Sequence, residues 1–499
     1  MKQFEKLRER LGRMADVHAA QAVLSWDQET YMPPGGGEAR AHHLGTLGRI
    51  AHEMLTDDRV GELLAAAADE VADLDPDSDD ARIVQVIGRD REKAVRLPAA
   101  LVGDLAGATA RAQQAWAQAR EQDDFASFQP HLERVLALTM EKAEALGYEE
   151  SPYDALLDEY EPDAKASDVA AVFAHLRSEL VPLVEAIADC PTPDDSCLRH
   201  AFPAADQWAF GEAVIADFGF DFARGRQDRS AHPFSTNFAT TDVRITTRVD
   251  EKFLPSALFG TLHEAGHAMY EQGVDPRLER TGLASGTSLG IHESQSRLWE
   301  NLVGRSATFW EHYYPKLQAQ FDAQLGATDL SMFHRAANRV EPSLIRVEAD
   351  EITYNLHVMI RFELELELVA GNLKVADLPA AWNAKYEESL GLVPGSDTDG
   401  VLQDIHWAFG LIGYFPTYTL GNLISVQLFE QAGRDLGDLD GQIGRGEFGP
   451  LRDWLAQNVH RHGRKFSADE LLQRITGGGL DAEPWLQYAR RKFGTLYGI

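Results

Sequence analysis

The chain has 499 residues, of which 44% are hydrophobic, and it carries a formal net charge of −32 at pH 7. Such a length exceeds one simple core, so we expect a single large domain over residues 1–499, with two lobes around a central cleft as the alternative. The negative charge and the lack of any basic run argue against a nucleic acid partner, because phosphates would be repelled. No uncharged apolar run reaches about 18 residues, so no membrane span is expected.

The N-terminal segment is charged and amphipathic, without the apolar core of a secretion signal. The cysteines, Cys190 and Cys197, flank a loop rich in Pro, Asp and Ser. Two free thiols are favoured there over a disulfide. The sequence therefore predicts a cytoplasmic protein.

Helical periodicity dominates the chain, and clusters of Gly, Pro and Asp separate the helical segments. Phe362–Leu368 alternates like a strand, yet Leu and Glu are strong helix formers, so we interpret it as helix. The predicted helices cover residues 2–25, 38–70, 80–120, 128–147, 166–188, 205–218, 254–272, 292–322, 330–340, 344–370, 378–389, 401–413, 420–434, 448–460 and 468–493.

One segment, residues 232–250, is β-branched and alternating, which predicts a short antiparallel sheet. It would either bind an extended peptide along its edge or serve as a plain structural hairpin. We therefore expect a mainly α fold with one small antiparallel sheet, divided in sequence into a helical part, 1–225, and a second part, 226–499.

The second part contains His263-Glu264-Ala265-Gly266-His267, an HExxH motif inside an apolar helical stretch. Residues four apart lie on one helix face, so His263 and His267 can reach a single zinc ion with bonds of about 2.0–2.1 Å. Glu264 is placed to take a proton from a water on the metal. The alternative is a pair of core histidines with no ion.

A catalytic zinc needs a third protein ligand, and a helical pattern resumes at residue 292 after a loop of small residues. We predict Glu293 as this ligand, with His292 as the competing choice. Glu293 could instead be a first-turn acid favoured by the helix dipole. Glu300 and Asp350 are candidates for orienting the ligand histidines.

Several sequence blocks, in order, resemble the Taq-type family of metallocarboxypeptidases. They are SWDQET from residue 25, HPF from 232, DVRIT from 242, HEAGH from 263, HESQSRLWEN from 292, IRVEAD from 345, GVLQDIHW from 400 and GYFPTYT from 413. The resemblance implies a helical, cleft-containing homodimeric metallopeptidase that removes single residues from peptide C-termini. The sheet would lie near its active site.

A C-terminal exopeptidase must bind a free carboxylate, and arginine does so with two parallel hydrogen bonds. Arg346 and Arg244 are the candidates, and the resemblance favours Arg346. Each could instead pair with a nearby acid. Gln403 is a candidate for binding the substrate backbone.

Peptide hydrolysis also needs a donor for the developing oxyanion. His406 is the preferred candidate, and its spacing to Tyr414 and Tyr418 resembles the donors of related helical zinc peptidases. Either tyrosine could instead belong to the core. Asp404 could fix the tautomer of a nearby histidine.

The sequence therefore predicts a zinc carboxypeptidase acting on peptides with a free C-terminal carboxylate. Cobalt is an alternative metal, because His/His/Glu ligation accepts both ions. The alternative functions are a zinc endo-oligopeptidase with the same metal chemistry and, less favoured, a non-catalytic peptide-binding protein that contains zinc.

Overall fold

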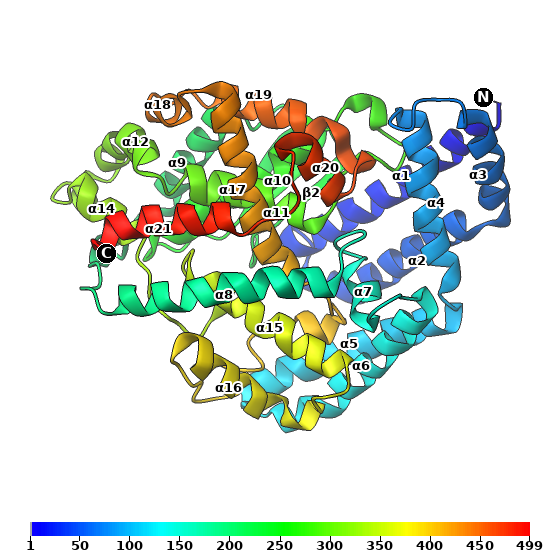
Figure 1. Cartoon of the computed structure of the whole chain (residues 1–499), viewed down its shortest axis with the longest axis horizontal. Helices are drawn as coiled ribbons and strands as arrows, with labels where there is room; N and C mark the ends of the chain where they lie inside the picture. The colour runs from blue at the N-terminus through cyan, green and yellow to red at the C-terminus, as the bar shows by residue number, and fades with distance from the viewer. Residues whose placement is uncertain (1) are drawn as a thin grey trace. The chain divides into compact units, whose positions relative to one another are not determined.

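The computed structural model describes residues 2–499, which are mostly helical with one small sheet (Figure 1). The predicted mainly α fold is confirmed. Within the described residues no helix is both long and apolar enough to cross a membrane. The α-helices are α1 (Lys2–Thr30), α2 (Gly37–Thr56), α3 (Asp58–Val71), α4 (Asp79–Arg96), α5 (Ala99–Gln122), α6 (Phe125–Leu146), α7 (Pro152–Leu157), α8 (Ala166–Ala188), α9 (Ala204–Phe218), α10 (Leu254–Gly273), α11 (Leu289–Arg297), α12 (Ala307–Gln320), α13 (Asp322–Leu325), α14 (Leu330–Ala337), α15 (Thr353–Val369), α16 (Leu378–Leu390), α17 (Pro416–Leu436), α18 (Leu439–Gly444), α19 (Gly449–Asn458), α20 (Ala468–Thr476) and α21 (Glu483–Tyr497).

Short helical turns and three strands complete the secondary structure of the described residues. The strands are β1 (Gly225–Arg229), β2 (Ser235–Ala239) and β3 (Asp242–Thr247). The turns are η1 (Pro34–Gly36), η2 (Ser196–Leu198), η3 (Pro276–Leu278), η4 (Leu298–Val303), η5 (Arg346–Glu348), η6 (Val375–Asp377), η7 (His406–Phe409) and η8 (His460–Lys465).

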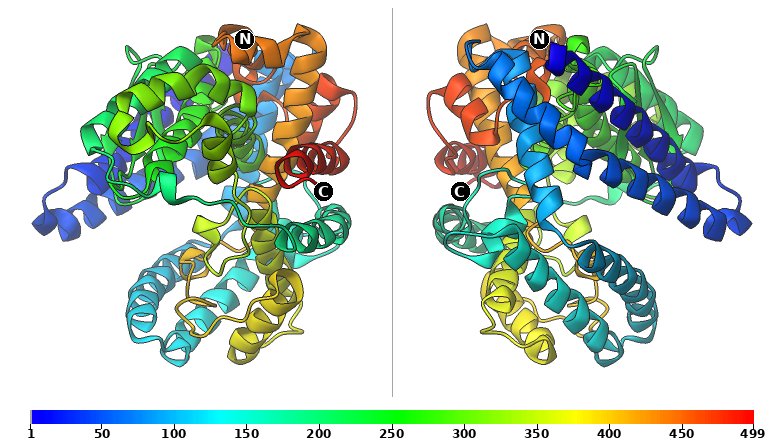
Figure 2. Two further views of the ribbon diagram at one scale, coloured as in Figure 1. Left: turned by 90° about the vertical axis from the view of Figure 1, so that its left-hand side faces the viewer. Right: turned by 90° about the vertical axis from the view of Figure 1, so that its right-hand side faces the viewer.

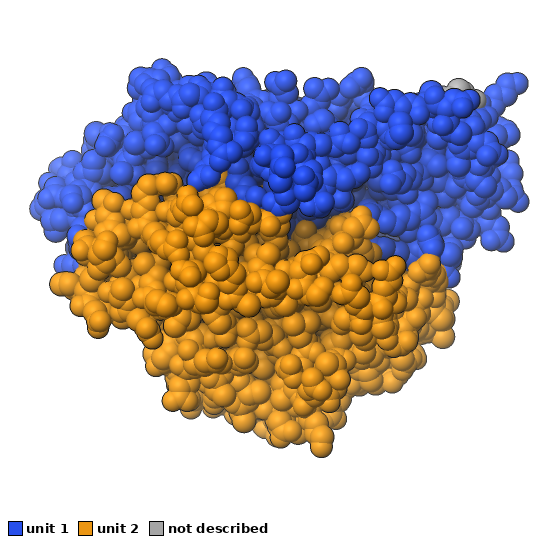
Figure 3. Space-filling model, viewed as in Figure 1, with its two compact units in different colours: residues 1–95, 194–337, 427–479 blue, residues 96–193, 338–426, 480–499 orange. Residues whose placement is uncertain are grey.

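The chain forms two compact units, which have different colours in Figure 3. Unit 1 contains residues 1–95, 194–337 and 427–479, and unit 2 contains residues 96–193, 338–426 and 480–499. Both units draw on both of the predicted parts of the sequence, so the division at residue 225 stays a prediction.

In unit 1 the long helix α1 lies beside α2 and α3 (Figure 2). The apolar faces of α1, α3 and α4 form a common core that also takes in the segment after α10. This packing anchors the segment that leads from α10 to α11. The fully or nearly fully buried residues of this core include Phe4, Leu7, Leu11, Val60, Leu63, Ala67, Ile83, Val274, Leu278 and Leu283.

The sheet of unit 1 has the strand order β1-β3-β2. Val243 and Ile245 on the central strand are fully buried, and β3 packs on α10. The alternate residue Arg244 points to the other face, where it meets Trp26 of α1. The predicted antiparallel pairing holds for β2 and β3. Strand β1 was not predicted, and it pairs with β3 in parallel.

In unit 2, α5 and α6 pack along each other, and α15 contacts α7, α8 and α16. Most of α15 is buried, including the charged residues Arg361 and Glu365, which are fully buried. Phe362–Leu368 lies inside this helix, so the helical interpretation is confirmed over the strand-like alternation.

Some predicted helices are broken where a local capping signal overrides helical periodicity. The predicted helix 38–70 is interrupted at Asp57, whose side chain accepts a hydrogen bond from the Arg59 N–H and caps α3. The predicted helix 80–120 is interrupted at Pro98, the N-cap of α5. The predicted helix 468–493 is two helices separated by a Gly-rich turn.

Three further predicted helices lie close to the motifs. In 292–322, Ser306 starts a new helix by accepting a hydrogen bond from the Phe309 N–H. In 344–370, Asp350 accepts backbone hydrogen bonds and ends the irregular stretch before α15. The segment 401–413 was wrong as a helix, since only η7 is helical there.

Candidate metal centre

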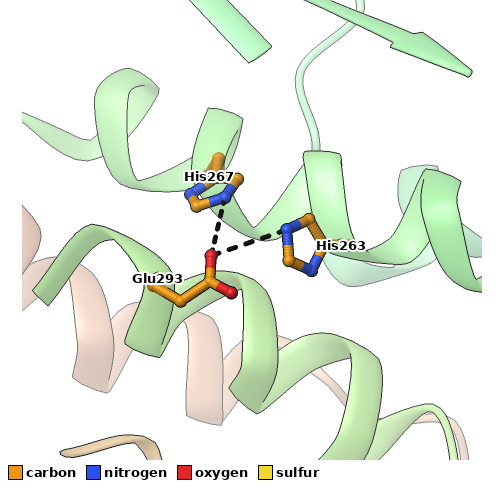
Figure 4. Close-up of side chains that lie close together, drawn as sticks. All are labelled: His263, His267 and Glu293. Atoms are coloured by element: carbon orange, nitrogen blue, oxygen red, sulfur yellow. Dashed lines mark ion pairs between the residues drawn. The ribbon is translucent and has the colours of Figure 1, made fainter. Parts of the chain in front are cut away.

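Helix α10 carries both histidines of the HExxH motif on one face. The helix begins with a proline in its first turn and is buried on most sides, so it is a fixed element of unit 1. His263 Nε2 and His267 Nε2 lie 3.6 and 3.3 Å from Glu293 Oε2 (Figure 4). One ligand atom from each of the three residues lies within 4.8 Å of the others. The structure therefore brings the predicted metal ligands together.

Glu293 comes from α11, which crosses α10 at very short range. A Cβ atom added to Gly266 would lie 2.5 Å from the Gln295 carbonyl oxygen and 2.6 Å from the Ser296 Cα. Only glycine permits this approach of two helix backbones. Ser288 caps α11 by accepting a hydrogen bond from the Ile291 N–H, so Glu293 stands in the second turn of the helix.

The donor set suits a divalent cation. Burial lowers the pKa of His267 to about 3, so this imidazole is neutral and its nitrogen lone pair is free for a metal. Burial opposes ionisation of Glu293, but the charges of Arg297 and His263 hold its pKa well below the usual range. Two neutral imidazoles and one carboxylate are the ligands of many catalytic zinc sites.

The charges around the centre also favour a bound cation. Burial disfavours protonation of His263, but Glu293 and Glu300 outweigh it and raise its pKa, so a bound cation would take the place of that proton. With both imidazoles neutral and all four carboxylates ionised, two negative charges are left over, which a divalent ion would balance. The buried carboxylates are Glu264, Glu271, Glu293 and Glu300, and the guanidinium groups paired with two of them are Arg297 and Arg305.

Glu300 orients the first histidine. Its Oε2 atom lies 3.0 Å from His263 Nδ1, and Arg297 and Arg305 hold its two oxygens at 3.3 Å. Glu300 lies in η4, a π-helical turn, and such turns are frequent at functional sites. Asp350, the other candidate for this role, instead accepts hydrogen bonds from Thr353 and the neighbouring backbone in unit 2.

His292 is not among the clustered ligand atoms. Its Nδ1 atom lies 2.6 Å from His267 Nδ1, and its Nε2 atom lies 2.8 Å from Glu271 Oε1. The two nitrogens are thus used in contacts with protein groups, which leaves Glu293 as the third ligand that the geometry supports.

Glu264 is a buried carboxylate without a protein partner. It is 6% exposed, and among residues 2–499 no hydrogen bond to its oxygens is found. Burial raises its pKa to about 7, with the neighbouring Glu293 charge acting in the same direction and His263 opposing both. A carboxylate with these properties can accept and return a proton near neutral pH.

In unit 2, Arg346 belongs to a buried network around Asp404. Arg346 donates to Asp404 at 2.7 Å and to the Tyr354 hydroxyl at 2.9 Å, and Arg361 donates to the other Asp404 oxygen at 2.6 Å. Asp404 is thus shared by two guanidinium groups, and the network retains one positive charge. An excess positive charge in a buried place favours binding of an anion.

Gln403 supports the same network. Its side-chain oxygen accepts hydrogen bonds from the Arg346 N–H at 2.9 Å and from Arg361 at 2.7 Å. Its amide nitrogen donates to backbone carbonyls of Leu344 and Asp399. The structure therefore shows Gln403 holding the backbone of the Arg346 segment.

His406 lies next to the predicted tyrosines. Its Nε2 atom is 3.2 Å from the Tyr418 hydroxyl, and its ring centroid is 5.4 Å from that of Tyr414. Its Nδ1 atom is 3.9 Å from Asp404 Oδ1. Burial lowers the pKa of His406 to about 4, the Arg346 charge adding to this and Asp404 opposing it, so the ring is neutral at pH 7.

Arg244 is held on the sheet of unit 1. Its guanidinium pairs with Asp242 through two hydrogen bonds of 2.9 Å. It also lies over the rings of Trp26 and Phe238, at 4.3 and 4.7 Å from their centroids. These contacts fix the side chain by charge and by cation–π attraction.

Comparison with known proteins gives the family. The model of the Carboxypeptidase Taq (M32) metallopeptidase family matches residues 6–493. The chain is 45% identical to thermostable carboxypeptidase 1 of Thermus thermophilus over 487 residues, which cover 96% of this chain and 95% of that protein. It is 39% identical to carboxypeptidase 1 of Bacillus subtilis over 488 residues, covering 98% and 97%. A crystal structure of the M32 carboxypeptidase from Deinococcus radiodurans R1 superposes with a TM-score of 0.97 at 46% identity and covers 100% of both chains.

The chain belongs to the Carboxypeptidase Taq (M32) metallopeptidase family. It is a metallocarboxypeptidase, as the resemblance predicted. The comparisons therefore favour this activity over the zinc endo-oligopeptidase and the non-catalytic peptide-binding protein. The family requires a divalent metal, and within residues 2–499 the cluster of His263, His267 and Glu293 has the geometry to hold one.

Sequence reasoning missed several residues of this carboxypeptidase that the structure brings into the two clusters. Glu271 stands four residues after His267, and Arg297 stands four residues after Glu293, so helical spacing alone could have indicated both. Arg361 lies in the middle of a buried helix, and no local pattern pointed to its contact with Asp404.

Proposed function

We propose that this carboxypeptidase binds one zinc ion through His263, His267 and Glu293 and thereby releases single amino acids from peptide C-termini. The observation that carries the proposal is the cluster of their ligand atoms beside the unpartnered, buried carboxylate of Glu264. Cobalt is the alternative ion, because it accepts the same ligands.

When bound, zinc supplies Lewis-acid chemistry, which polarises a carbonyl group and lowers the pKa of a coordinated water toward about 7. Glu264 accepts a proton from the attacking water and delivers it to the leaving amine. The burial of Glu264 and the lack of a protein partner among the described residues leave its carboxylate available for this exchange.

His406, Tyr414 and Tyr418 are proposed as donors to the developing oxyanion. The contact of His406 Nε2 with the Tyr418 hydroxyl supports a shared role, and the neutral state of the imidazole leaves one N–H to donate. Asp404 Oδ1 lies 3.9 Å from His406 Nδ1, beyond hydrogen-bonding distance, and among the described residues this nitrogen has no hydrogen-bond partner, so no contact supports a role of Asp404 in fixing the tautomer.

Arg346 is proposed to bind the terminal carboxylate of the substrate. The positive charge left over when Arg346 and Arg361 share Asp404 supports this role. Arg244 and Gln403 are proposed as further substrate contacts. The Arg244 guanidinium pairs with Asp242 through two hydrogen bonds, which is the alternative to substrate binding that its sequence context allows. Gln403 would act through the backbone that it holds.

The remaining predictions concern the setting of the enzyme. We propose a homodimer in the cytoplasm that acts on peptides and binds neither nucleic acid nor membrane. Cys190 and Cys197 are free thiols in the structure. Sedimentation equilibrium of the purified enzyme tests the homodimer.

A peptide digestion experiment tests the activity and the bond that is cut. A mixed set of peptides, as free acids and as C-terminal amides, is incubated with enzyme loaded with zinc, loaded with cobalt, or treated with a chelator, and the products are identified by mass spectrometry. Stepwise loss of C-terminal residues from the free acids alone, abolished by the chelator, is expected. Internal cuts in the amidated peptides would contradict the proposal and the role of Arg346.

The Glu264→Gln variant tests the proton-transfer role. It should keep a stoichiometric metal content and lose about 10²–10⁴-fold in kcat, because general acid–base catalysis contributes about that factor. Full activity in this variant would refute the assignment of Glu264.

A further inference from the structure

The two proposed ligand histidines differ in the group that each contacts through Nδ1. His263 contacts a carboxylate, whereas His267 contacts another histidine. His263 Nδ1 meets Glu300 directly at 3.0 Å, whereas His267 Nδ1 meets His292 Nδ1 at 2.6 Å. His292 Nε2 continues to Glu271 Oε1 at 2.8 Å. A buried negative charge therefore lies behind each ligand histidine, but one of the two connections runs through an extra imidazole.

The hydrogen positions along this connection follow from the chemistry of the groups. His267 Nε2 is the atom nearest Glu293, so it must keep its lone pair for the metal, and the ring hydrogen stays on Nδ1. His292 Nδ1 must then accept that hydrogen, which leaves the hydrogen of His292 on Nε2. The His292 Nε2–H group donates to the Glu271 carboxylate, so each N–H group along the connection from His267 to Glu271 faces an acceptor.

Glu271 is held in place by further donors. Its Oε2 atom accepts from Asn237 of β2 at 2.7 Å, and its Oε1 atom accepts from the Gly286 N–H at 3.1 Å. Glu271 is 5% exposed, so its charge is not shared with bulk water. A carboxylate that is buried and has defined donors at both oxygens holds its partners in one geometry.

The His292 ring is also fixed by packing. A Cβ atom on Gly286 would lie 2.5 Å from His292 Cδ2, and the Tyr270 ring centroid is 5.2 Å from that of His292. The ring is therefore confined between a glycine and an aromatic side chain, and rotation would break both of its hydrogen bonds.

We propose that His292 and Glu271 form a relay that positions His267 for metal binding. The inference rests on the proposed function, because it takes His263, His267 and Glu293 as the ligands. His292 and Glu271 are positioning residues, acting on the metal through His267. Groups in contact with metal ligands typically contribute about 10–100-fold to metal affinity.

The relay is tested by metal affinity, measured on apo-protein by competition with a chelator of known zinc affinity. The variants are His292→Phe, Glu271→Gln and the double variant. Glu300→Gln reports the direct connection to His263, and His263→Ala reports loss of a ligand. His460→Phe is the matched control, since the His460 ring centroid is 5.2 Å from that of Tyr270, as is the His292 centroid, but His460 bonds Gln295 rather than a ligand. Thermal unfolding of each apo-protein shows that it is folded.

The relay predicts about 10–100-fold weaker zinc binding in His292→Phe and in Glu271→Gln, with one ion still bound per chain. The double variant should lose little more than either single variant, because one break disconnects the whole relay. The visible absorption bands of the cobalt-loaded single variants should shift in the same direction, and the His460→Phe control should match the wild type.

Two results would overturn the relay: unchanged zinc affinity in folded His292→Phe, or additive losses in the double variant, which indicate two separate structural contributions. Failure of the proposed function has a different signature. In that case wild-type protein binds no zinc, or His263→Ala binds it with wild-type affinity. Should His292→Phe fail to fold, folded Glu271→Gln with wild-type zinc affinity overturns the relay by itself.

Discussion

The short approach of α10 and α11 at Gly266 makes a strong prediction about the substitution Gly266→Ala. The added methyl group would lie 2.5 Å from the Gln295 carbonyl oxygen, whereas ordinary contact begins at 3.4 Å. The three nearest atoms all belong to the α11 backbone at Gln295 and Ser296, so no side chain can rotate away. The helix that carries Glu293 must therefore retreat from α10 by about 1 Å.

The effects of this retreat on stability and on activity differ in size. Overpacking costs about 1–3 kcal/mol in the free energy of unfolding. Replacing a helical glycine by alanine returns about 1 kcal/mol, so the net loss in the free energy of unfolding is about 0–2 kcal/mol. Displacing a catalytic group by about 1 Å costs about 10²-fold in rate, so activity should fall far more than stability.

The matched control is Gly260→Ala on the same helix. A Cβ atom there would lie 3.6 Å from Thr247 Oγ1 and 3.8 Å from Pro233 Cγ, which is ordinary contact. This variant should be more stable by up to about 1 kcal/mol and fully active. The measurements are kcat/KM on a free-acid peptide, zinc affinity of the apo-protein and denaturant unfolding. Wild-type kcat/KM and zinc affinity in Gly266→Ala would refute the idea that this contact sets the position of Glu293.

Further predictions concern buried charges and the metal. Asp404→Asn leaves the guanidinium groups of Arg346 and Arg361 without a buried counter-charge, so denaturant titration should show a loss of about 3–5 kcal/mol, and a loss below about 1 kcal/mol would contradict this. Burial raises the pKa of Glu365 to about 7 from 4.5, so its folded state keeps a proton that the unfolded chain releases. The free energy of unfolding should therefore fall by up to about 3 kcal/mol as pH rises through that window, and Glu365→Gln should flatten this slope. Zinc at 100-fold its Kd should stabilise the chain by about 2.7 kcal/mol over chelated protein, and an equal Tm with and without zinc would contradict metal binding to the folded state.

Two of the proposed metal ligands were predictable because helical spacing alone places His263 and His267 on one face. The choice between His292 and Glu293 as the third ligand could not be made from helical spacing. These residues are adjacent on one helix, about 100° apart around its axis, so the sequence allows either to face the metal. The contact of Gly266 with the backbone of α11 decides which one does, and this contact is a tertiary feature.

Strand β1 and the helix breaks at Asp57 and Pro98 differ in whether the local sequence determines them. Strand β1 has the sequence GRQDR, which lacks β-branched and aromatic residues, so only its pairing with β3 makes it a strand. The helix breaks at Asp57 and Pro98, by contrast, follow from local capping chemistry, which overrides the apolar periodicity that predicts continuous helices there.

Most residues of the candidate metal centre nevertheless lie within one or two helical turns of a proposed ligand in the sequence. Glu271 follows His267 by one helical turn, and Arg297 and Glu300 follow Glu293 by one and two turns. Each group that orients a ligand or balances its charge thus comes from the same segment as a ligand. Two helical segments and a glycine contact between them then suffice to assemble the ligands and the carboxylates behind them. This explains why five motif residues predict the chemistry, while the relay through His292 becomes visible only once the two helices are packed.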